Sequence, residues 1–234
     1  KVEDEIANII SEIVNSIAEV RNPKEKVKLQ KMKEKIRNRI MESLTELDLT
    51  NWDTSSVIDM SSMFYECKNS RINMRNLNTV NVEKMNNLFN SATNITVDLY
   101  GIKMDNLTTL SSAFYNSQIN GVLDFSNSVL SSNVPCMINE NIFYNCDVDT
   151  IKFFKSYAPK GEVRLFDHCL AYNLTGLSGL DLSEATSLNR MFTYCTNLQN
   201  LDASNWNTTN ITKISYFTEE SALKTVNISN WDLS

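Results

Sequence analysis

A column of acidic and amide residues recurs along the chain, each between two apolar residues. Its members are Asp48, Asn73, Asp98, Asp124, Lys152, Asp181, Asp202 and Asn227. An apolar–polar–apolar triplet is typical of a strand with one buried face, so the middle side chain is expected to face solvent. If the strands lie side by side, these side chains stack above one another and form a candidate ligand-binding surface.

Two interpretations of this column are open. Stacked carboxylates at strand spacing repel each other, so hydrogen bonds from neighbouring Ser, Thr and Asn residues, together with the charge of Lys152, would have to offset the repulsion. Alternatively, the column binds a cation or a cationic ligand, because carboxylate and amide oxygens suit calcium. A calcium-dependent shift of the melting midpoint would favour the second interpretation. No cofactor or dedicated metal site is predicted.

Enzyme chemistry is not indicated. His168 is the only histidine, and it directly precedes Cys169. A nucleophilic Cys–His pair needs side chains that meet, whereas adjacent residues on a helical turn point apart. The sequence contains no CxxC zinc pair, no glycine-rich phosphate loop and no serine-nucleophile motif. We therefore expect a protein that is not an enzyme.

Four cysteines share one position, three residues after a phenylalanine: Cys67, Cys146, Cys169 and Cys195. Elsewhere that position holds Ala92, Ser117 or Ser221. A position that accepts Cys, Ala or Ser favours a small side chain in a tight packing site, so we expect buried free thiols. Cys136 lies off this column and is expected to be the most exposed thiol.

These columns arise from a repeat of about 25 residues. Four positions keep the period through three copies: Trp52, Leu77 and Ile102; Val57, Val82 and Leu107; Met60, Met85 and Leu110; Phe64, Phe89 and Phe114. The phenylalanine column continues at Phe143, Phe166 and Phe192. Eight apolar pairs mark the predicted strands: Leu47/Leu49, Ile72/Met74, Val97/Leu99, Leu123/Phe125, Ile151/Phe153, Leu180/Leu182, Leu201/Ala203 and Val226/Ile228. So short a unit cannot bury its apolar face alone, and neighbours must stack.

The second part of each unit has helical spacing. V-x-x-M-x-x-M-F places apolar residues three and four positions apart, which predicts a short helix with Thr54 or Ser55 at its N-cap. Strands on one side and short helices on the other give an α/β repeat. The predicted fold is a leucine-rich-repeat solenoid of about eight units over residues 44–234, with a parallel β-ladder on one face.

Residues 1–43 lie outside the repeat. An apolar stripe from Val2 to Val20, then Asn22-Pro23-Lys24-Glu25 as a helix start, predict a helical hairpin with a basic second helix. We expect it to cap the open end of the solenoid at Leu47. Contact of the basic helix with anionic lipid, wall polymer or a partner helix is an alternative, and so is a truncated coiled-coil stalk.

The charge distribution limits the partners. The net charge of −6 is carried by residues 44–234, because residues 1–43 hold ten Lys/Arg and eight Asp/Glu. An acidic body is a poor nucleic-acid binder. No apolar run approaches the roughly 20 residues of a membrane span, and Lys1 leads into an amphipathic pattern instead of a signal peptide. We expect a monomer without nucleic acid or a membrane span.

The motif L-D-L-x-N-W-D-T-S-x-V-x-x-M-x-x-M-F-x-x-C, which begins at Leu47, resembles the BspA-like leucine-rich-repeat surface proteins of mycoplasmas, lactobacilli, other bacteria and some parasitic protists. The likeness covers Leu44–Lys68 and Thr196–Leu233, and more loosely residues 69–118. It implies a cell-surface or secreted module, such as a bacterial lipoprotein, that binds a host or matrix protein or a glycan in adhesion.

Two function classes follow, and a third is much less favoured by the sequence. The first is a non-enzymatic recognition scaffold that uses the strand face or the exposed edge of the solenoid. The second is a structural stalk or spacer of a larger surface protein with no specific ligand. The third is an enzyme whose site lies in the irregular region Ser126–Ala158.

Overall fold

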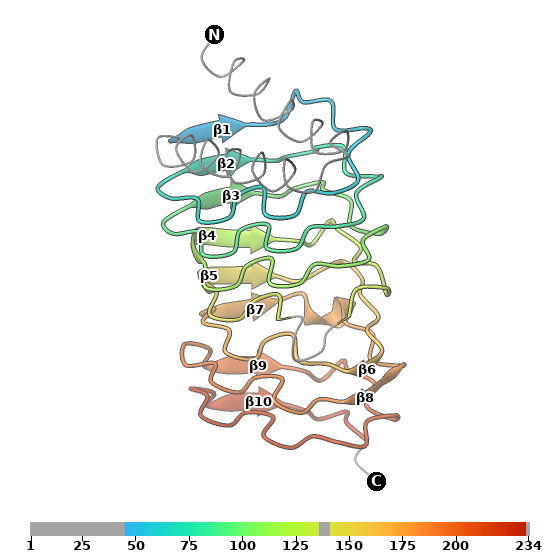
Figure 1. Ribbon diagram of the computed structural model, residues 1–234. Helices are drawn as coiled ribbons and strands as arrows, with labels where there is room; N and C mark the ends of the chain where they lie inside the picture. The colour runs from blue at the N-terminus through green and yellow to red at the C-terminus, as the bar shows by residue number, and fades with distance from the viewer. Residues whose placement is uncertain (1–44, 136–140, 233–234) are drawn as a thin grey trace, which may run out of the picture.

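The computed structural model describes residues 45–135 and 141–232, and these residues form a parallel β-solenoid whose coils stack along one axis (Figure 1). The strands are β1 (Glu46–Asp48), β2 (Arg71–Asn73), β3 (Thr96–Asp98), β4 (Gln118–Asp124), β5 (Asp147–Lys152), β6 (Gly161–Glu162), β7 (Asn173–Thr175), β8 (Ala185–Ser187), β9 (Asn200–Asp202) and β10 (Thr225–Asn227). The pairings between these strands are parallel. This is the expected result when successive coils run in the same direction.

Eight of the strands form a ladder that consists of three hydrogen-bonded sheets, β1–β2–β3, β4–β5–β7 and β9–β10. β1 to β5, β7, β9 and β10 follow one another along one side of the solenoid, and β6 pairs with β8 on another side (Figure 1). In the first coils the register advances by one repeat, with Leu47 opposite Ile72 and Ile72 opposite Val97. The centres of seven predicted strands lie in this ladder, so the repeat and its parallel stacking are confirmed.

The eighth predicted strand is misplaced. Leu180 and Leu182 lie outside the strands, and the ladder position belongs to β7, whose centre is Leu174. Leu180 instead forms an isolated parallel bridge with Tyr157. The error arose because Leu180-Asp181-Leu182 has the expected triplet, whereas Asn173-Leu174-Thr175 has a single apolar residue.

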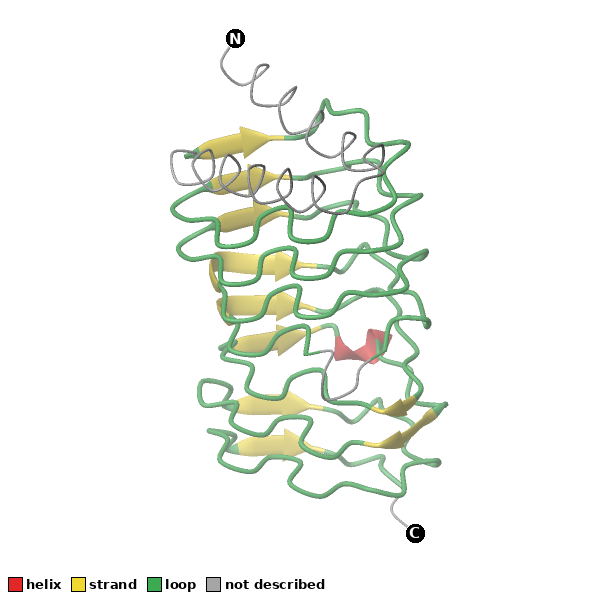
Figure 2. Cartoon of the chain, viewed as in Figure 1, coloured by secondary structure: helices red, strands yellow, loops and turns green. Residues whose placement is uncertain are grey.

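The predicted leucine-rich-repeat fold with short helices is wrong. Within residues 45–135 and 141–232 the coils consist of strands, turns and one short 3-10 helix, η1 (Leu177–Gly179), without an α-helix (Figure 2). The segment that was predicted to be helical forms consecutive turns. Ser62 and Glu66 have φ values of 59° and 56°, in the left-handed region that a right-handed helix excludes. The hairpin predicted for residues 1–43 lies outside the described residues.

Hydrogen bonding explains why this segment is not helical. The N–H of Met63 donates to Met60 O within a turn, whereas the N–H of Ser62 donates to Asn86 O of the next coil at 2.8 Å. Phe64 likewise donates to Leu88 O at 2.9 Å. Alternate N–H groups therefore join neighbouring coils, while an α-helix would use each N–H within the same segment.

The recurring threonine of the repeat also has a different role from the predicted helix cap. Thr54 is buried, and its hydroxyl donates to Asn78 O of the next coil at 2.7 Å. Thr79 repeats this contact with Lys103 O at 2.9 Å and also accepts the Lys103 N–H at 2.8 Å. Each threonine thus supplies a polar link between coils in an otherwise apolar interior.

A continuous aromatic ladder fills the core. The buried phenylalanine rings stack in sequence with centroid separations of 5.0 to 5.9 Å. They are Phe64, Phe89, Phe114, Phe143, Phe166 and Phe192. Trp206 stacks on Phe192 at 6.2 Å, and Trp231 stacks on Trp206 at 6.0 Å. Because each ring packs against rings in the coils on both sides, the ladder ties the stability of every coil to its neighbours.

The predicted burial of the cysteine column is confirmed. Cys67, Cys146, Cys169 and Cys195 are buried free thiols. Burial raises the pKa of the Cys169 thiol to about 12, and it raises the pKa of Cys67 as well. The column therefore provides packing and holds its thiols in the protonated form. Cys136 lies outside the described residues.

These thiols are expected to resist alkylation in the native protein. The thiolate is the reactive species, and burial lowers both its population and its access to reagent. In a Cys136→Ser variant, mass spectrometry after brief iodoacetamide treatment should show no label at the four buried cysteines, and full label after unfolding in urea. Rapid native labelling at any of the four would contradict the packing described above.

Candidate functional site

The predicted polar column lies at the ends of the ladder strands. Asp48, Asn73, Asp98, Asp124, Lys152, Asp202 and Asn227 are the last residues of β1, β2, β3, β4, β5, β9 and β10. These residues are exposed or partly exposed, and the strand centres beside them are buried except for Val226 of β10. Asp181 is not part of this column, because it follows η1 and Thr175 takes its place at the end of β7. The structure therefore brings seven of the eight predicted residues together.

The acidic and amide members of the column close turns. One side-chain oxygen accepts the N–H two residues further on, as in Asp48 with Thr50 (3.1 Å), Asp98 with Tyr100 (3.0 Å) and Asp202 with Ser204 (3.1 Å). Asn73 and Asn227 make the same contact. This Asx turn redirects the chain where a strand ends. One oxygen of each residue is thus committed to the backbone.

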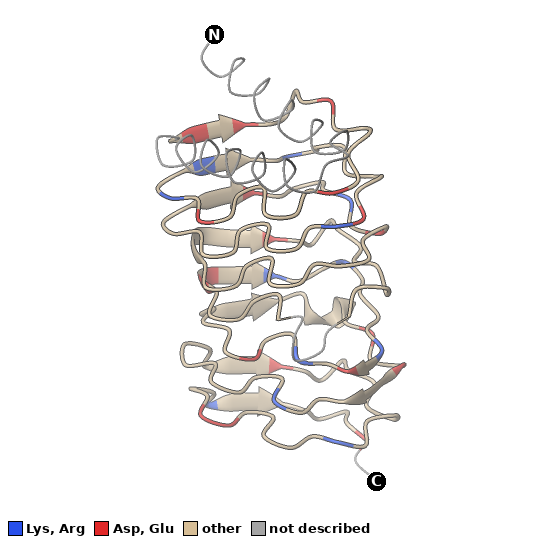
Figure 3. Cartoon of the chain, viewed as in Figure 1, with Lys and Arg blue, Asp and Glu red and all other residues tan. Residues whose placement is uncertain are grey.

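The second carboxylate oxygens of the column are partly neutralised. Asp98 Oδ2 lies 2.9 Å from Arg75 Nε, and Asp124 Oδ2 lies 2.9 Å from Lys152 Nζ. Across residues 45–135 and 141–232, no three His, Cys, Asp or Glu side chains gather as a potential metal site. Acidic and basic residues are both distributed over the coils (Figure 3). Ion pairing and Asx turns together provide the hydrogen bonds that offset the stacked charges.

Protonation of Asp124 and Asp202 should weaken the fold. Partial burial by itself would raise the pKa of Asp124, but the hydrogen bonds from Lys152 and Ser126 outweigh it and lower the pKa. The hydroxyl and N–H of Ser204 likewise lower the pKa of Asp202. A carboxyl group with a lowered pKa stabilises the folded state above its unfolded pKa of about 4, and this contribution is lost as the pH falls through the folded value.

Thermal unfolding followed by circular dichroism should therefore show a melting temperature that falls as the pH drops below about 4. Asp124→Asn keeps the acceptor for Ser126 but cannot be protonated in this range, so its melting temperature should fall less steeply. An equally steep acid dependence in Asp124→Asn would show that the Lys152 pair contributes nothing.

The ladder is interrupted between β7 and β9. β7 ends one hydrogen-bonded sheet and β9 belongs to another, and Figure 1 shows them further apart than their neighbours. The other break, between β3 and β4, is bridged by Ile95 and Ile119. Two side chains donate hydrogen bonds between the coils of β7 and β9: Asn197 Nδ2 donates to Leu170 O at 2.8 Å and Trp206 Nε1 donates to Leu177 O at 3.1 Å.

A trough of about 590 Å³ lies over this part of the ladder. β7, β9 and β10 line it together with Tyr172. The first and last residues of the three strands form two polar walls, Asn173, Asn200 and Thr225 on one side and Thr175, Asp202 and Asn227 on the other. The trough thus crosses three coils along the solenoid axis. It falls in the size range of about 300–1,000 Å³ that is usual for ligand sites.

Residues 29–150 and 162–234 match the family described as "Mycoplasma protein of unknown function, DUF285". The chain belongs to this family. The DUF285 match includes every strand that lines the trough. No curated protein and no solved structure matches the chain.

Two residues of the predicted column, Asp202 and Asn227, line the trough of this DUF285 chain. Ligand binding by the column, these two residues included, stays a prediction. The sequence did not point to Tyr172, Asn173 and Thr175, because the ladder strand of that coil was assigned to Leu180 and Leu182. The only available signal was the 23-residue step from Ile151 to Leu174, which is close to the repeat length.

A second aromatic stack lies on the outside of the DUF285 solenoid and was not predicted. Tyr115 stacks on Tyr144 at 5.1 Å, and His168 lies between Tyr144 and Tyr194 at 4.5 and 4.6 Å. Tyr115 and Tyr144 follow the core phenylalanine by one residue, whereas His168 and Tyr194 follow it by two. This shift hid the column in the sequence.

The orientation of His168 is fixed by the buried Asp167. His168 Nδ1 lies 2.7 Å from Asp167 Oδ1, and Asp167 also pairs with Arg164, which is buried too. Cys169 is buried, whereas His168 is partly exposed between its two tyrosines. The imidazole is therefore held as part of the outer stack.

In the described part of the chain, no helix is long and apolar enough to cross a membrane.

Proposed function

We propose that this protein is a non-enzymatic recognition scaffold that acts at the cell surface and binds a host or matrix ligand through the strand face. The trough over β7, β9 and β10 carries the proposal. It combines polar walls with an exposed aromatic side chain, Tyr172, and such a mixture of hydrogen-bonding groups and apolar surface is usual in binding sites.

The solenoid supports this role because it holds the trough in place. Core rings stack from Phe166 through Phe192 and Trp206 to Trp231 in the coils that carry the trough, and backbone hydrogen bonds pair β9 with β10. A site on such a frame loses little conformational entropy when a ligand binds. The resemblance of the repeat motif to BspA-like surface proteins favours the cell surface and an adhesive role.

The proposal is tested with the whole chain in two assays. Binding to immobilised matrix proteins and to a glycan array should be detectable for the wild type and lost in a Tyr172→Ala/Asn200→Ala double variant. Tyr100→Ala is a matched control, since Tyr100 is also exposed but lies outside the trough. Protease treatment of intact cells should remove the protein if it is on the surface. A protein that binds no ligand in either assay would contradict the proposed function.

A structural spacer is the second candidate, and the continuous core ladder is the observation that favours it. Stacked rings from Phe64 to Trp231 give a stiff rod that needs no ligand to be ordered. In that case substitutions in the trough should leave adhesion of cells unchanged, whereas removal of complete coils should alter it.

A further inference from the structure

We propose that the trough binds an extended, uncharged, β-linked glycan that runs across the three coils, with Tyr172 as a stacking platform at one end. This inference rests on the proposed function and specifies the ligand class of the same site. It is carried by the chemistry of the walls, the axial direction of the trough and the exposed ring of Tyr172.

The walls suit a neutral polyhydroxyl ligand. Five of the six wall residues bear amides or hydroxyls, and amides and hydroxyls both donate and accept hydrogen bonds, as sugar hydroxyls do. Asp202 is the single charged wall residue, and Ser204 already donates two hydrogen bonds to its Oδ1. The trough therefore offers no cation for a sulfated or sialylated glycan, and no cluster of carboxylates for a basic peptide.

Several of these polar groups have hydrogen-bonding capacity left. Asn200 Oδ1 accepts the Thr225 hydroxyl at 2.5 Å, and Asn173 Nδ2 donates to Asp149 O at 3.3 Å. Within the described ranges, Asn200 Nδ2 and Asn173 Oδ1 then have no protein partner. These contacts orient the two amides and leave one donor and one acceptor on the same wall of the trough.

The direction of the trough favours a chain ligand. The three lining strands belong to successive coils, and the paired strands β9 and β10 lie ~4.8 Å apart, whereas β7 lies across the break in the ladder. The β9–β10 spacing is close to the length of one sugar residue in an extended β-linked glycan. Two successive sugars over β9 and β10 would therefore each meet an equivalent pair of wall residues, one from the first and one from the last position of a strand, and a further sugar would lie over the wider step to β7.

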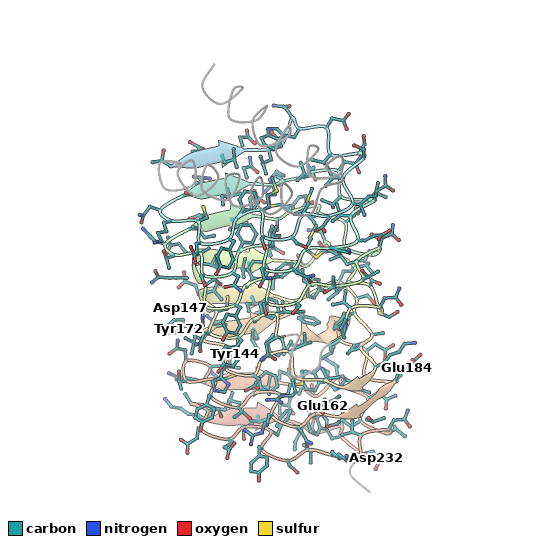
Figure 4. The ribbon with its side chains drawn as sticks, in the orientation of Figure 1. Tyr144, Asp147, Glu162, Tyr172, Glu184 and Asp232 are labelled. Carbon is teal, nitrogen blue, oxygen red and sulfur yellow. The ribbon has the colours of Figure 1, made fainter. Side chains whose placement is uncertain are left out.

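Tyr172 supplies the apolar platform. Tyr172 is 53% exposed and directly precedes β7. It lies on the side of the solenoid where the ladder strands begin, the same side as Asp147, the first residue of β5 (Figure 4). The faces of Tyr144 are covered by Tyr115 and His168. By contrast, Tyr172 stacks on no ring among the described residues, so a face of its ring is available to the C–H groups of a sugar.

Isothermal titration of the full chain with cellohexaose and chitohexaose tests the inference. We expect binding of at least one of these β-1,4-linked hexasaccharides, and much weaker binding of the helical α-1,4-linked maltohexaose and of an anionic heparin hexasaccharide. Tyr172→Ala and Asn200→Ala should each weaken binding about tenfold or more, which is a free-energy change of about 1.4 kcal/mol or more. Tyr100→Ala should bind like the wild type, and circular dichroism should confirm that all variants are folded.

The possible failures are distinct. If neither hexasaccharide binds, or if binding is unaffected by both trough substitutions, the glycan inference is overturned. If the chain binds a matrix protein through the trough but no oligosaccharide, the inference fails and the proposed function stands. If it binds nothing in any assay, both fail.

Discussion

Replacing Phe114 with alanine is expected to destabilise the solenoid by about 3–5 kcal/mol. The Phe114 ring is buried, stacks on Phe89 at 5.4 Å and on Phe143 at 5.7 Å, and meets Phe125 edge-on at 5.7 Å. Its removal leaves a cavity and also breaks ring contacts worth about 0.5–1.5 kcal/mol each beyond burial. Because coils contact only their neighbours, the substitution should uncouple the coils on either side of Phe114, so that the two parts of the solenoid unfold separately.

Urea unfolding measured by two probes checks this result. Two of the three tryptophans, Trp206 and Trp231, lie in the C-terminal coils, and Trp52 lies in the first coil. Tryptophan fluorescence therefore reports mainly on the C-terminal coils, whereas far-ultraviolet circular dichroism reports on all coils. The two curves should coincide for the wild type and separate for Phe114→Ala. Phe114→Leu fills most of the space and should cost clearly less. A Phe114→Ala protein with coincident curves and a loss below about 1 kcal/mol would show that the ladder does not couple the coils.

Replacing Gly179 with alanine should have the second large effect. A Cβ atom at this residue of η1 would lie 2.1 Å from Phe154 O and 2.9 Å from Lys155 O, both backbone atoms of the preceding coil. Backbone cannot move aside as a flexible side chain can, so the coils must separate. We expect a loss at or above the upper end of the ~1–3 kcal/mol typical of overpacking.

Gly161→Ala is the matched control for Gly179→Ala. Gly161 has φ +70°, and no atom lies within 4 Å of the position that its Cβ would occupy, so the substitution costs only the left-handed backbone penalty of about 1–2 kcal/mol. The difference between the two variants in urea midpoint isolates the steric clash. Equal losses would mean that the close approach at η1 is easily relaxed.

The ladder could be predicted from sequence because its signal is a repeated triplet. Leu47, Ile72 and Val97 recur at a fixed period, and a period-2 pattern with a buried centre has few explanations other than stacked strands. β7 lacks this pattern because Asn173 and Thr175 flank a single apolar residue. The triplet at Leu180 was then the better match by composition, although the chain places it on another side.

The helices were predicted wrongly because spacing alone cannot separate a helix from a series of turns. Met60, Phe64 and Cys67 are buried in both, and the distinction lies in the backbone at Ser62 and Glu66, which adopt positive φ. In later coils this conformation falls on Asn, His, Arg or Tyr, so residue type gave no consistent warning. The trough could not be predicted either, since it depends on a break in pairing between β7 and β9.

The bonds between coils have a consequence for how such a protein can change in length. The Leu49 N–H donates to Asn73 O of the next coil, and the Met74 N–H of that coil donates to Asp98 O of the one after it. Each of these coils therefore donates to its successor from the same position at which its predecessor donates to it. Deletion or duplication of one complete repeat would bring together surfaces that already match, whereas any other length would misalign rings and carbonyls at the junction. Recombination between similar repeat-coding segments would therefore lengthen or shorten the rod in whole-coil steps. It would move the trough nearer to or further from the other end of the solenoid without rebuilding it.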